Sequence, residues 1–346
     1  MSEVKLSASR IKTAKTCSWL YWVKYHLMLP DKKNDGSSRG DICHNVFEFL
    51  GKNNKKRLSY YSEIIKQQDA FSVPSIKRYI LSQAADKNVD DQENLTLIND
   101  MIVSGLEYDF YGKDFGKPTK CYSEYEFDIS VDEKNKKYRI KGFIDKLFLY
   151  KSKKVALIRD FKTSKNVFKG KEVSENLQDY MYCLAVRHLF PEYTNRKSEF
   201  VFLKFDLKSG DESKGLLKMD KITAADLNKF EKNLTDVQLY LSKFNQRMAK
   251  SNYAADQKVT KEDGFAGQIV CGFARYRGQP KKNGDPMWHC AYKFPFDYYA
   301  LYDENEDLVK TAFMEDYYEL IKMKKSDWII RKENYQGCPR FNSTEY

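Results

Sequence analysis

The 346-residue chain lacks several patterns that would each place it in a familiar class of protein. No apolar run approaches the roughly 20 residues of a membrane-spanning helix, and the first residues hold no apolar core of a secretory signal. The seven cysteines form no Cys-x-x-Cys pair, which argues against a zinc ribbon and against a disulfide framework. No Gly-x-x-x-x-Gly-Lys-Ser/Thr motif occurs, so we expect no helicase activity in this chain.

The charge balance and the aromatic content point to a partner. Lys and Arg number 60 against 49 Asp and Glu, a formal net charge of +11. With 25 Tyr and 22 Phe, this balance favours a polyanion that also offers planar bases, although it does not distinguish DNA from RNA. Scattered cysteines in odd number predict buried thiols in a reducing cytoplasm.

The hydrophobic pattern predicts a helical start, a helical insertion, a strand meander and a strand–helix–strand unit. Helices are predicted over Ser7–Leu27, Asp41–Leu50, Ser174–Leu189, Ala224–Ala249 and near Leu308–Lys325. Strands are predicted over Tyr122–Val131, Lys137–Tyr150, Lys154–Phe161 and Glu199–Leu207. This order implies an α/β fold with a mixed central sheet flanked by helices. We assign residues 1–215 to the core, with the insertion at about 53–119, and residues 216–346 to a helical, aromatic-rich extension packed on it.

The chemistry concentrates in one stretch, where Asp145 is followed by Asp160 and Lys162. Strand residues two apart share a face, so Asp160 and Lys162 project together. If the two segments pair as a hairpin, Asp145 can lie near Asp160. Two carboxylates at that distance repel unless a cation lies between them or one is protonated. Such a hard oxygen site suits Mg²⁺ or Mn²⁺. The alternative to a metal site is that these charged residues simply flank an apolar strand at a solvent-exposed edge.

Five short motifs stand in order between Ser7 and Leu207. They are SASRIKTAKTCSWLYWVKY, RGDICHNVFE with His44, GFID with Asp145, DFKT with Asp160 and Lys162, and QDYMY with Gln178 and Tyr182. Together they resemble the RecB-like branch of the PD-(D/E)XK nuclease superfamily, which includes the nuclease domains of RecB and AddB, the CRISPR adaptation nucleases and phage exonucleases. The resemblance implies a restriction-endonuclease-like core.

The resemblance also implies a role for each matching residue. Catalytic roles would go to Asp145, Asp160 and Lys162. The metal ligands would be His44, Asp145, Asp160 and the backbone carbonyl of Phe161. Nucleic-acid contacts would come from Gln178, Tyr182 and Thr163. Considered alone, His44 on an apolar helix is also typical of a core histidine. For Glu124 and Glu126, on the strand expected to face Asp145, the sequence leaves open whether one supports the metal or Lys162.

By this resemblance we expect an Mg²⁺- or Mn²⁺-dependent deoxyribonuclease, an exonuclease on single strands or DNA ends in recombination, repair or phage DNA processing. The alternatives are a structure-specific endonuclease and a non-cleaving, nucleic-acid-binding component of a larger complex. The expected partners are DNA and a helicase, recombinase, or CRISPR or phage replication protein, without a membrane. The expected location is the cytoplasm, which is the host cytoplasm if the protein is viral.

The family has an iron–sulfur variant with one N-terminal cysteine and three close together near the C-terminus. Cys17 stands where the first would be, but Cys271, Cys290 and Cys338 are far apart in the sequence. Lys293 occupies the position where Cys290 would otherwise begin a Cys-x-x-Cys pair. We therefore expect buried thiols and no iron–sulfur cluster.

Overall fold

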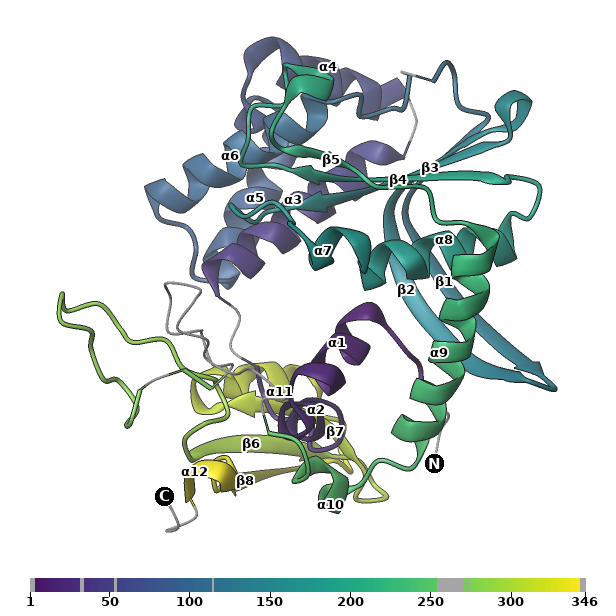
Figure 1. Ribbon diagram of the computed structural model, residues 1–346. Coiled ribbons are helices and arrows are strands. Elements are labelled where there is room, and N and C mark those ends of the chain that lie inside the picture. The colour runs from purple at the N-terminus through teal and green to yellow at the C-terminus, as the bar shows by residue number, and fades with distance from the viewer. Residues whose placement is uncertain are drawn as a thin grey trace. The chain divides into compact units, whose positions relative to one another are not determined.

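The computed structural model describes residues 4–31, 34–52, 55–113, 115–253, 271–272 and 274–342. The chain divides into unit 1, Met1–Ala8 and Lys33–Leu239, and unit 2, Ser9–Lys32 and Tyr240–Tyr346 (Figure 1). The predicted core of residues 1–215 thus contributes its first helices to unit 2. Residues 53–54 and 114 of the predicted insertion, and 254–270 and 273 of the predicted extension, lie outside the described residues.

A five-stranded mixed sheet forms the centre of unit 1 (Figure 1). Its spatial order follows the sequence: β1 (Lys120–Glu133), β2 (Lys136–Tyr150), β3 (Val155–Lys162), β4 (Asn195–Phe202) and β5 (Leu216–Lys218). Neighbours pair antiparallel except β3 and β4, which pair in parallel. A parallel pair needs a crossover connection, and helix α8 (Leu177–Leu189) lies in it. The predicted mixed sheet flanked by helices is confirmed.

Helices cover both faces of this sheet. Four helices of the N-terminal half pack an apolar cluster against Phe161 of β3 and Val201 of β4. They are α3 (Asp35–Gly51), α4 (Lys55–Gln67), α5 (Pro74–Asp86) and α6 (Gln92–Glu107). Alternate strand residues face opposite sides, so Asp160 faces the other layer, where it meets Tyr182 of α8. The sheet end that carries Asp160 thus lies between two helical layers.

Several predicted helices begin or break elsewhere than expected. The helix predicted over Ala224–Ala249 is two helices, α9 (Ala224–Ser242) and α10 (Gln246–Ala249), and the one predicted over Ser174–Leu189 begins at Leu177. Helix α3 starts at Asp35 rather than Asp41, because the Asn34 side chain caps it by accepting from the Ser37 amide. The helix predicted over Ser7–Leu27 is two helices, α1 (Ala8–Thr16) and α2 (Ser18–Tyr25). Cys17 separates them because its backbone is extended and its sulfur caps α2.

Unit 2 contains a three-stranded antiparallel sheet where the sequence analysis predicted irregular structure and a helix. Its order is β7 (Leu308–Phe313), β6 (Phe296–Tyr302) and β8 (Ile329–Tyr335). The helix predicted near Leu308–Lys325 is wrong in its first half, where the Val and Thr of LVKTAF favour a strand. Its second half is α11 (Tyr317–Met323). Among the described residues, no helix has the length and apolarity needed to cross a membrane.

Candidate active site

Three carboxylates occupy adjacent positions across the first three strands of unit 1. The β1–β2 pairs on either side, Ser123 with Lys146 and Tyr125 with Ile144, place Glu124 opposite Asp145. The β2–β3 register, continued by one residue, places Asp160 next in the row. Residues opposite one another on neighbouring strands project to the same face, so these acids form a cross-strand row. Regular β2–β3 pairing stops here, and the Asp145 Oδ2 atom instead accepts a hydrogen bond of 2.7 Å from the Phe161 amide.

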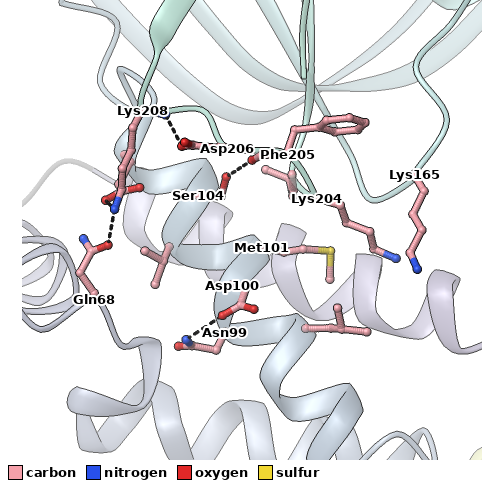
Figure 2. Close-up of a pocket in the computed structure, with 14 residues that line it drawn as sticks. Gln68, Asn99, Asp100, Met101, Ser104, Lys165, Lys204, Phe205, Asp206 and Lys208 are labelled. Atoms are coloured by element: carbon pink, nitrogen blue, oxygen red, sulfur yellow. Dashed lines mark hydrogen bonds and ion pairs between the residues drawn. The ribbon is translucent and has the colours of Figure 1, made fainter. Parts of the chain in front are cut away.

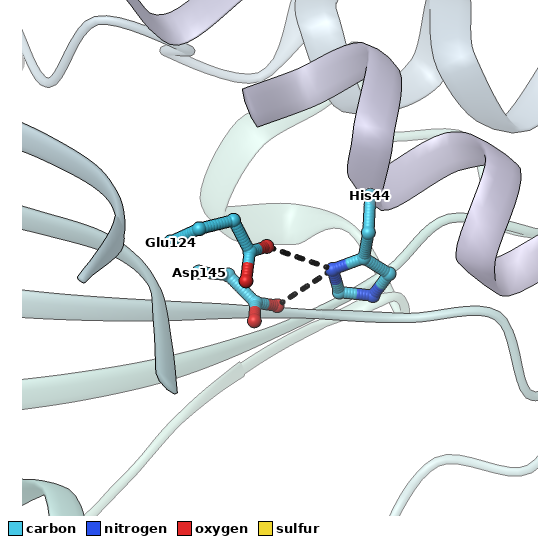
Figure 3. Close-up of side chains that lie close together, drawn as sticks. All are labelled: His44, Glu124 and Asp145. Atoms are coloured by element: carbon cyan, nitrogen blue, oxygen red, sulfur yellow. Dashed lines mark hydrogen bonds and ion pairs between the residues drawn. The ribbon is translucent and has the colours of Figure 1, made fainter. Parts of the chain in front are cut away.

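His44 approaches this row from helix α3. Its Nδ1 atom lies 3.4 Å from Glu124 Oε1 and 3.4 Å from Asp145 Oδ2. One ligand atom from each of the three residues lies within 4.8 Å of the other two, a grouping able to hold a metal ion (Figure 3). The helix packs tightly here, since a Cβ at Gly40 would lie 3.2 Å from Thr163 Oγ1.

Glu124 is the member of this cluster that the sequence analysis left undecided. Its backbone φ is +48°, in the left-handed region that costs a non-glycine residue energy and that recurs at functional sites. Glu126 instead pairs with Lys141 at 2.9 Å on an exposed part of β1. The signal that separates the two glutamates is register, because only Glu124 is opposite Asp145.

Asp160 belongs to a second, adjoining network. Lys162 Nζ lies 2.6 Å from Asp160 Oδ2 and donates to Gln178 Oε1 at 2.8 Å. Asp160 Oδ1 accepts from Gln178 Nε2 at 2.6 Å and from the Tyr182 hydroxyl at 3.1 Å. Gln178 and Tyr182 lie one helical turn apart on α8, so both reach the same carboxylate. The structure therefore joins these two predicted nucleic-acid contacts to Asp160 and Lys162, the predicted catalytic acid and lysine.

The predicted ligand set is only partly gathered in this arrangement. His44 and Asp145 meet, whereas Asp160 lies outside the compact cluster and Glu124 lies inside it. The carbonyl of Phe161 as a ligand, and contacts of Thr163, Gln178 and Tyr182 with nucleic acid, stay predictions.

The electrostatics of the row favour a bound cation. Burial, followed by repulsion from Asp160, raises the pKa of Asp145 well above its ordinary value. Burial lowers the pKa of His44, but Asp145 and the hydrogen bond to Glu124 outweigh it and raise this pKa to about 9. The nearby carboxylates therefore favour the protonated form of His44. A divalent cation would neutralise the same negative charge.

Four cysteines of unit 2 form a second cluster of ligating side chains. Besides burial, which is the largest cause, the thiols of Cys17, Cys271 and Cys290 all raise the pKa of Cys338. The Cys290 amide donates to the Cys271 carbonyl at 3.1 Å. Although far apart in the sequence, these four residues lie near enough in the fold to affect one another's pKa. Cys17, Cys271 and Cys338 are buried as expected, and the absence of an iron–sulfur cluster stays a prediction.

Burial raises the pKa of Cys271, Cys290 and Cys338, while hydrogen bonds to these sulfurs act in the opposite direction. Backbone amides donate to three of the four sulfurs: Leu20 to Cys17, Tyr292 to Cys290 and Arg340 to Cys338. The side chain of Arg340 donates to Cys271.

A lysine completes these surroundings. The Nζ atom of Lys293 is buried, donates to the Gly272 carbonyl at 2.9 Å, and interacts electrostatically with Cys271, Cys290 and Cys338. Hydrogen bonds and a nearby positive charge both favour the deprotonated form of a thiol.

Comparison with known proteins bears on unit 1 and part of unit 2. Residues 5–276 match the model of the PD-(D/E)XK nuclease superfamily, which is most of the chain. The match does not specify a branch of the superfamily. No significant match to a curated protein was found.

Proposed function

The chain belongs to the PD-(D/E)XK nuclease superfamily, and from that premise we propose that it is a metal-dependent deoxyribonuclease, acting as an exonuclease on single strands or DNA ends. The observation that carries the proposal is the row of Glu124, Asp145 and Asp160, with His44 above it and Lys162 beside it. Three acids on one face of the sheet can hold a cation, and Lys162, which contacts only Asp160 of the three, can act on the phosphodiester beside it.

Mg²⁺ or Mn²⁺ would be held by His44, Glu124 and Asp145, and Asp160 joins this set by family resemblance. The donors are mainly carboxylate oxygens, which fit these hard cations. When bound, the cation would stabilise charge on the scissile phosphate and lower the pKa of a coordinated water.

Lys162 has the clearest role among the protein's own groups. Asp160 and Gln178 fix its ammonium at the edge of the acid row. From there it would orient the attacking water or neutralise the anion that develops on the phosphate. The pKa of Tyr182 is raised well above its ordinary value by burial and then by Asp160, so its hydroxyl remains a donor that positions this acid.

The alternatives are a structure-specific endonuclease and a non-cleaving nucleic-acid-binding component. The presence of His44, Asp145, Asp160 and Lys162 together disfavours the second. A helicase, recombinase, or CRISPR or phage replication protein would supply the DNA ends, with the cytoplasm as the location.

The test uses end-labelled single-stranded, double-stranded and circular DNA, and RNA, with Mg²⁺, Mn²⁺ or EDTA. We expect metal-dependent shortening of linear DNA from an end. Cleavage of circular DNA would favour the endonuclease. Binding without cleavage of any substrate would favour the non-cleaving component.

We further propose that Cys17, Cys271, Cys290 and Cys338 hold an iron–sulfur cluster, reversing the expectation from sequence spacing. All four are described residues, and no three of their sulfurs lie within 4.8 Å of one another. A single zinc with Zn–S bonds of about 2.3 Å would bring its tetrahedral sulfurs to about 3.8 Å. These sulfurs are therefore not gathered as a single zinc would need, and four cysteines are the ligand number of an iron–sulfur cluster.

Protein purified without oxygen should contain iron and acid-labile sulfide and be coloured. Cys290→Ser should lose both, while Cys121→Ser, which alters a thiol of unit 1, should keep them. A colourless protein, or one that contains only zinc, would refute the iron–sulfur assignment.

A further inference from the structure

A pocket of about 620 Å³ opens in unit 1 beside the strand ends that carry the candidate active site. Helix α6 forms one wall, and the segments that follow β3 and β4 form the other (Figure 2). Lys165, three residues after Lys162, and Lys204, two residues after the end of β4, both line it. In Figure 2 their ammonium groups lie close together at one side of the pocket.

The positive charge at this side is not neutralised. Neither Lys165 nor Lys204 has an acidic partner among the described residues, whereas Lys208, across the pocket, lies 3.3 Å from Glu107 and donates to Gln68. Burial, and then the charges of Arg39 and Lys165, lower the pKa of Lys204, in keeping with the short separation of the Lys165 and Lys204 ammonium groups in Figure 2. Unpaired like charges repel, so their proximity is favourable only if an anion joins them.

Arg39 adds a buried donor to this group. Its Nη1 atom donates to Asn94 Oδ1, while its buried Nε atom has no hydrogen-bond partner among the described residues. Guanidinium groups are well suited to donate hydrogen bonds to the oxygens of a phosphate. The acid Asp100 also lines the pocket, where it accepts a hydrogen bond from Asn99.

The backbone ties this group to the candidate active site. The Leu203 amide donates to the Lys162 carbonyl at 2.8 Å, so the segment that leads into Lys204 is fixed to the catalytic lysine. On the other side, Gly40 follows Arg39 and packs against Thr163. Lys204 thus follows the segment that is hydrogen-bonded to Lys162, and Arg39 precedes the glycine that packs against Thr163.

We propose that Arg39, Lys165 and Lys204 bind a phosphate of the nucleic-acid strand other than the one that is cleaved. The inference rests on the proposed nuclease function and deepens it, because a second phosphate anchor fixes which bond reaches the acid row. The ligand chemistry is a phosphate, which is either an internal phosphodiester or a terminal monoester.

The experiment measures binding of fluorescent single-stranded oligonucleotides in EDTA, so that binding is separated from cleavage. Lys165→Ala/Lys204→Ala should weaken binding about tenfold at low salt and reduce the salt slope by about 0.7 for each phosphate that the protein no longer neutralises. The matched control, Lys77→Ala/Lys229→Ala, removes the same charge from exposed positions on α5 and α9 (Ala224–Ser242). Lys165→Arg/Lys204→Arg should restore binding.

Oligonucleotides with a 5′-phosphate, a 3′-phosphate or neither distinguish the sources of the phosphate. A weakening confined to one phosphorylated end identifies a terminal monoester, and an equal weakening for all three identifies an internal phosphodiester. Affinity and salt slope equal to those of the control pair would overturn the inference, as would absence of binding by the wild type. Binding that weakens as expected in the variant, but no cleavage in any metal, would support this site and refute the nuclease.

Discussion

The two clusters of ligating side chains differ in almost every chemical respect. In unit 1, His44, Glu124 and Asp145 offer mostly oxygen atoms and are partly exposed. In unit 2, the cluster offers four sulfurs, three of them on buried cysteines, with N–H donors and a buried lysine around them. Hard oxygen ligands suit an exchangeable Mg²⁺ or Mn²⁺, whereas thiolates suit a tightly held soft metal group.

A comparison of two acids within unit 1, Glu231 and Asp145, shows why a bound cation would stabilise the acid row. Glu231 of α9 is buried and Asp145 is largely so, but Lys136 and Arg187 lie 2.8 Å and 2.5 Å from the Oε2 atom of Glu231. Asp145 instead neighbours Glu124 and Asp160. The pKa of the first acid falls and that of the second rises. The protein's own cations thus neutralise Glu231, whereas the repulsion between Asp145 and its neighbouring acids favours an added cation.

The largest effect should come from Asp145→Asn. The amide keeps the shape of the side chain and can still accept from the Phe161 N–H, but it removes a charged ligand. We expect cleavage to fall about 10³-fold or more. The control is Asp132→Asn, which alters an exposed acid of β1 paired with Lys137. Cleavage by Asp145→Asn at the rate of this control would show that the acid row is not the active site.

Lys162→Ala should reduce the turnover rate by roughly 10²–10⁴-fold, the usual scale for a proton-transfer or electrostatic group. Lys162 contacts Asp160 and Gln178 and is not part of the proposed phosphate-binding group of Arg39, Lys165 and Lys204. Its loss should therefore change the affinity for DNA far less than the rate. Single-turnover cleavage and binding in EDTA separate the two quantities. A loss of binding as large as the loss of rate would make Lys162 a phosphate anchor only.

Mn²⁺ affinity should rise with pH. The pKa of His44 is raised to about 9 and that of Asp145 is raised, so both groups hold protons that a cation must displace. Below the raised pKa of His44 the proton competes, and affinity should fall by up to roughly tenfold per pH unit for each proton displaced. Calorimetry at pH 6, 7 and 8 measures this.

A matched variant tests the cause of this pH dependence. Glu124→Gln removes one of the acids that hold the proton on His44, so it should flatten the dependence while weakening binding. Affinity that is independent of pH in the wild type would contradict the proposed ligand set.

The two clusters also differ in how far the sequence reveals them. Strand periodicity and the short turn after Tyr150 are enough to predict that Asp145, Asp160 and Lys162 converge, because local pairing sets the register. Glu124 needs the exact register, since Glu126 lies on the same face of the strand.

The thiol cluster could not be predicted from spacing. Cys17, Cys271 and Cys338 meet only through tertiary packing, and separation along the chain is no measure of distance in a fold. The sheet of unit 2 was not predicted either, because its strands pair through the tertiary fold and the prediction used only local sequence pattern.

The smallest effect should come from Glu231→Gln, which probes the acid that has cations of its own. Burial raises the pKa of Glu231, but hydrogen bonds from Lys136, Tyr138 and Arg187 outweigh it and lower this pKa to about 2. Replacing the charge should reduce the free energy of unfolding by about 1–3 kcal/mol at pH 7. A depressed pKa means that this stability is present above the ordinary pKa of 4.5 and is lost as the pH falls toward 2. Denaturant unfolding at pH 7 and pH 3, with exposed Glu192→Gln as the control, should therefore show a difference from wild type that shrinks in acid. If the difference were the same at both pH values, the contrast between a neutralised and an unneutralised buried acid in unit 1 would fail.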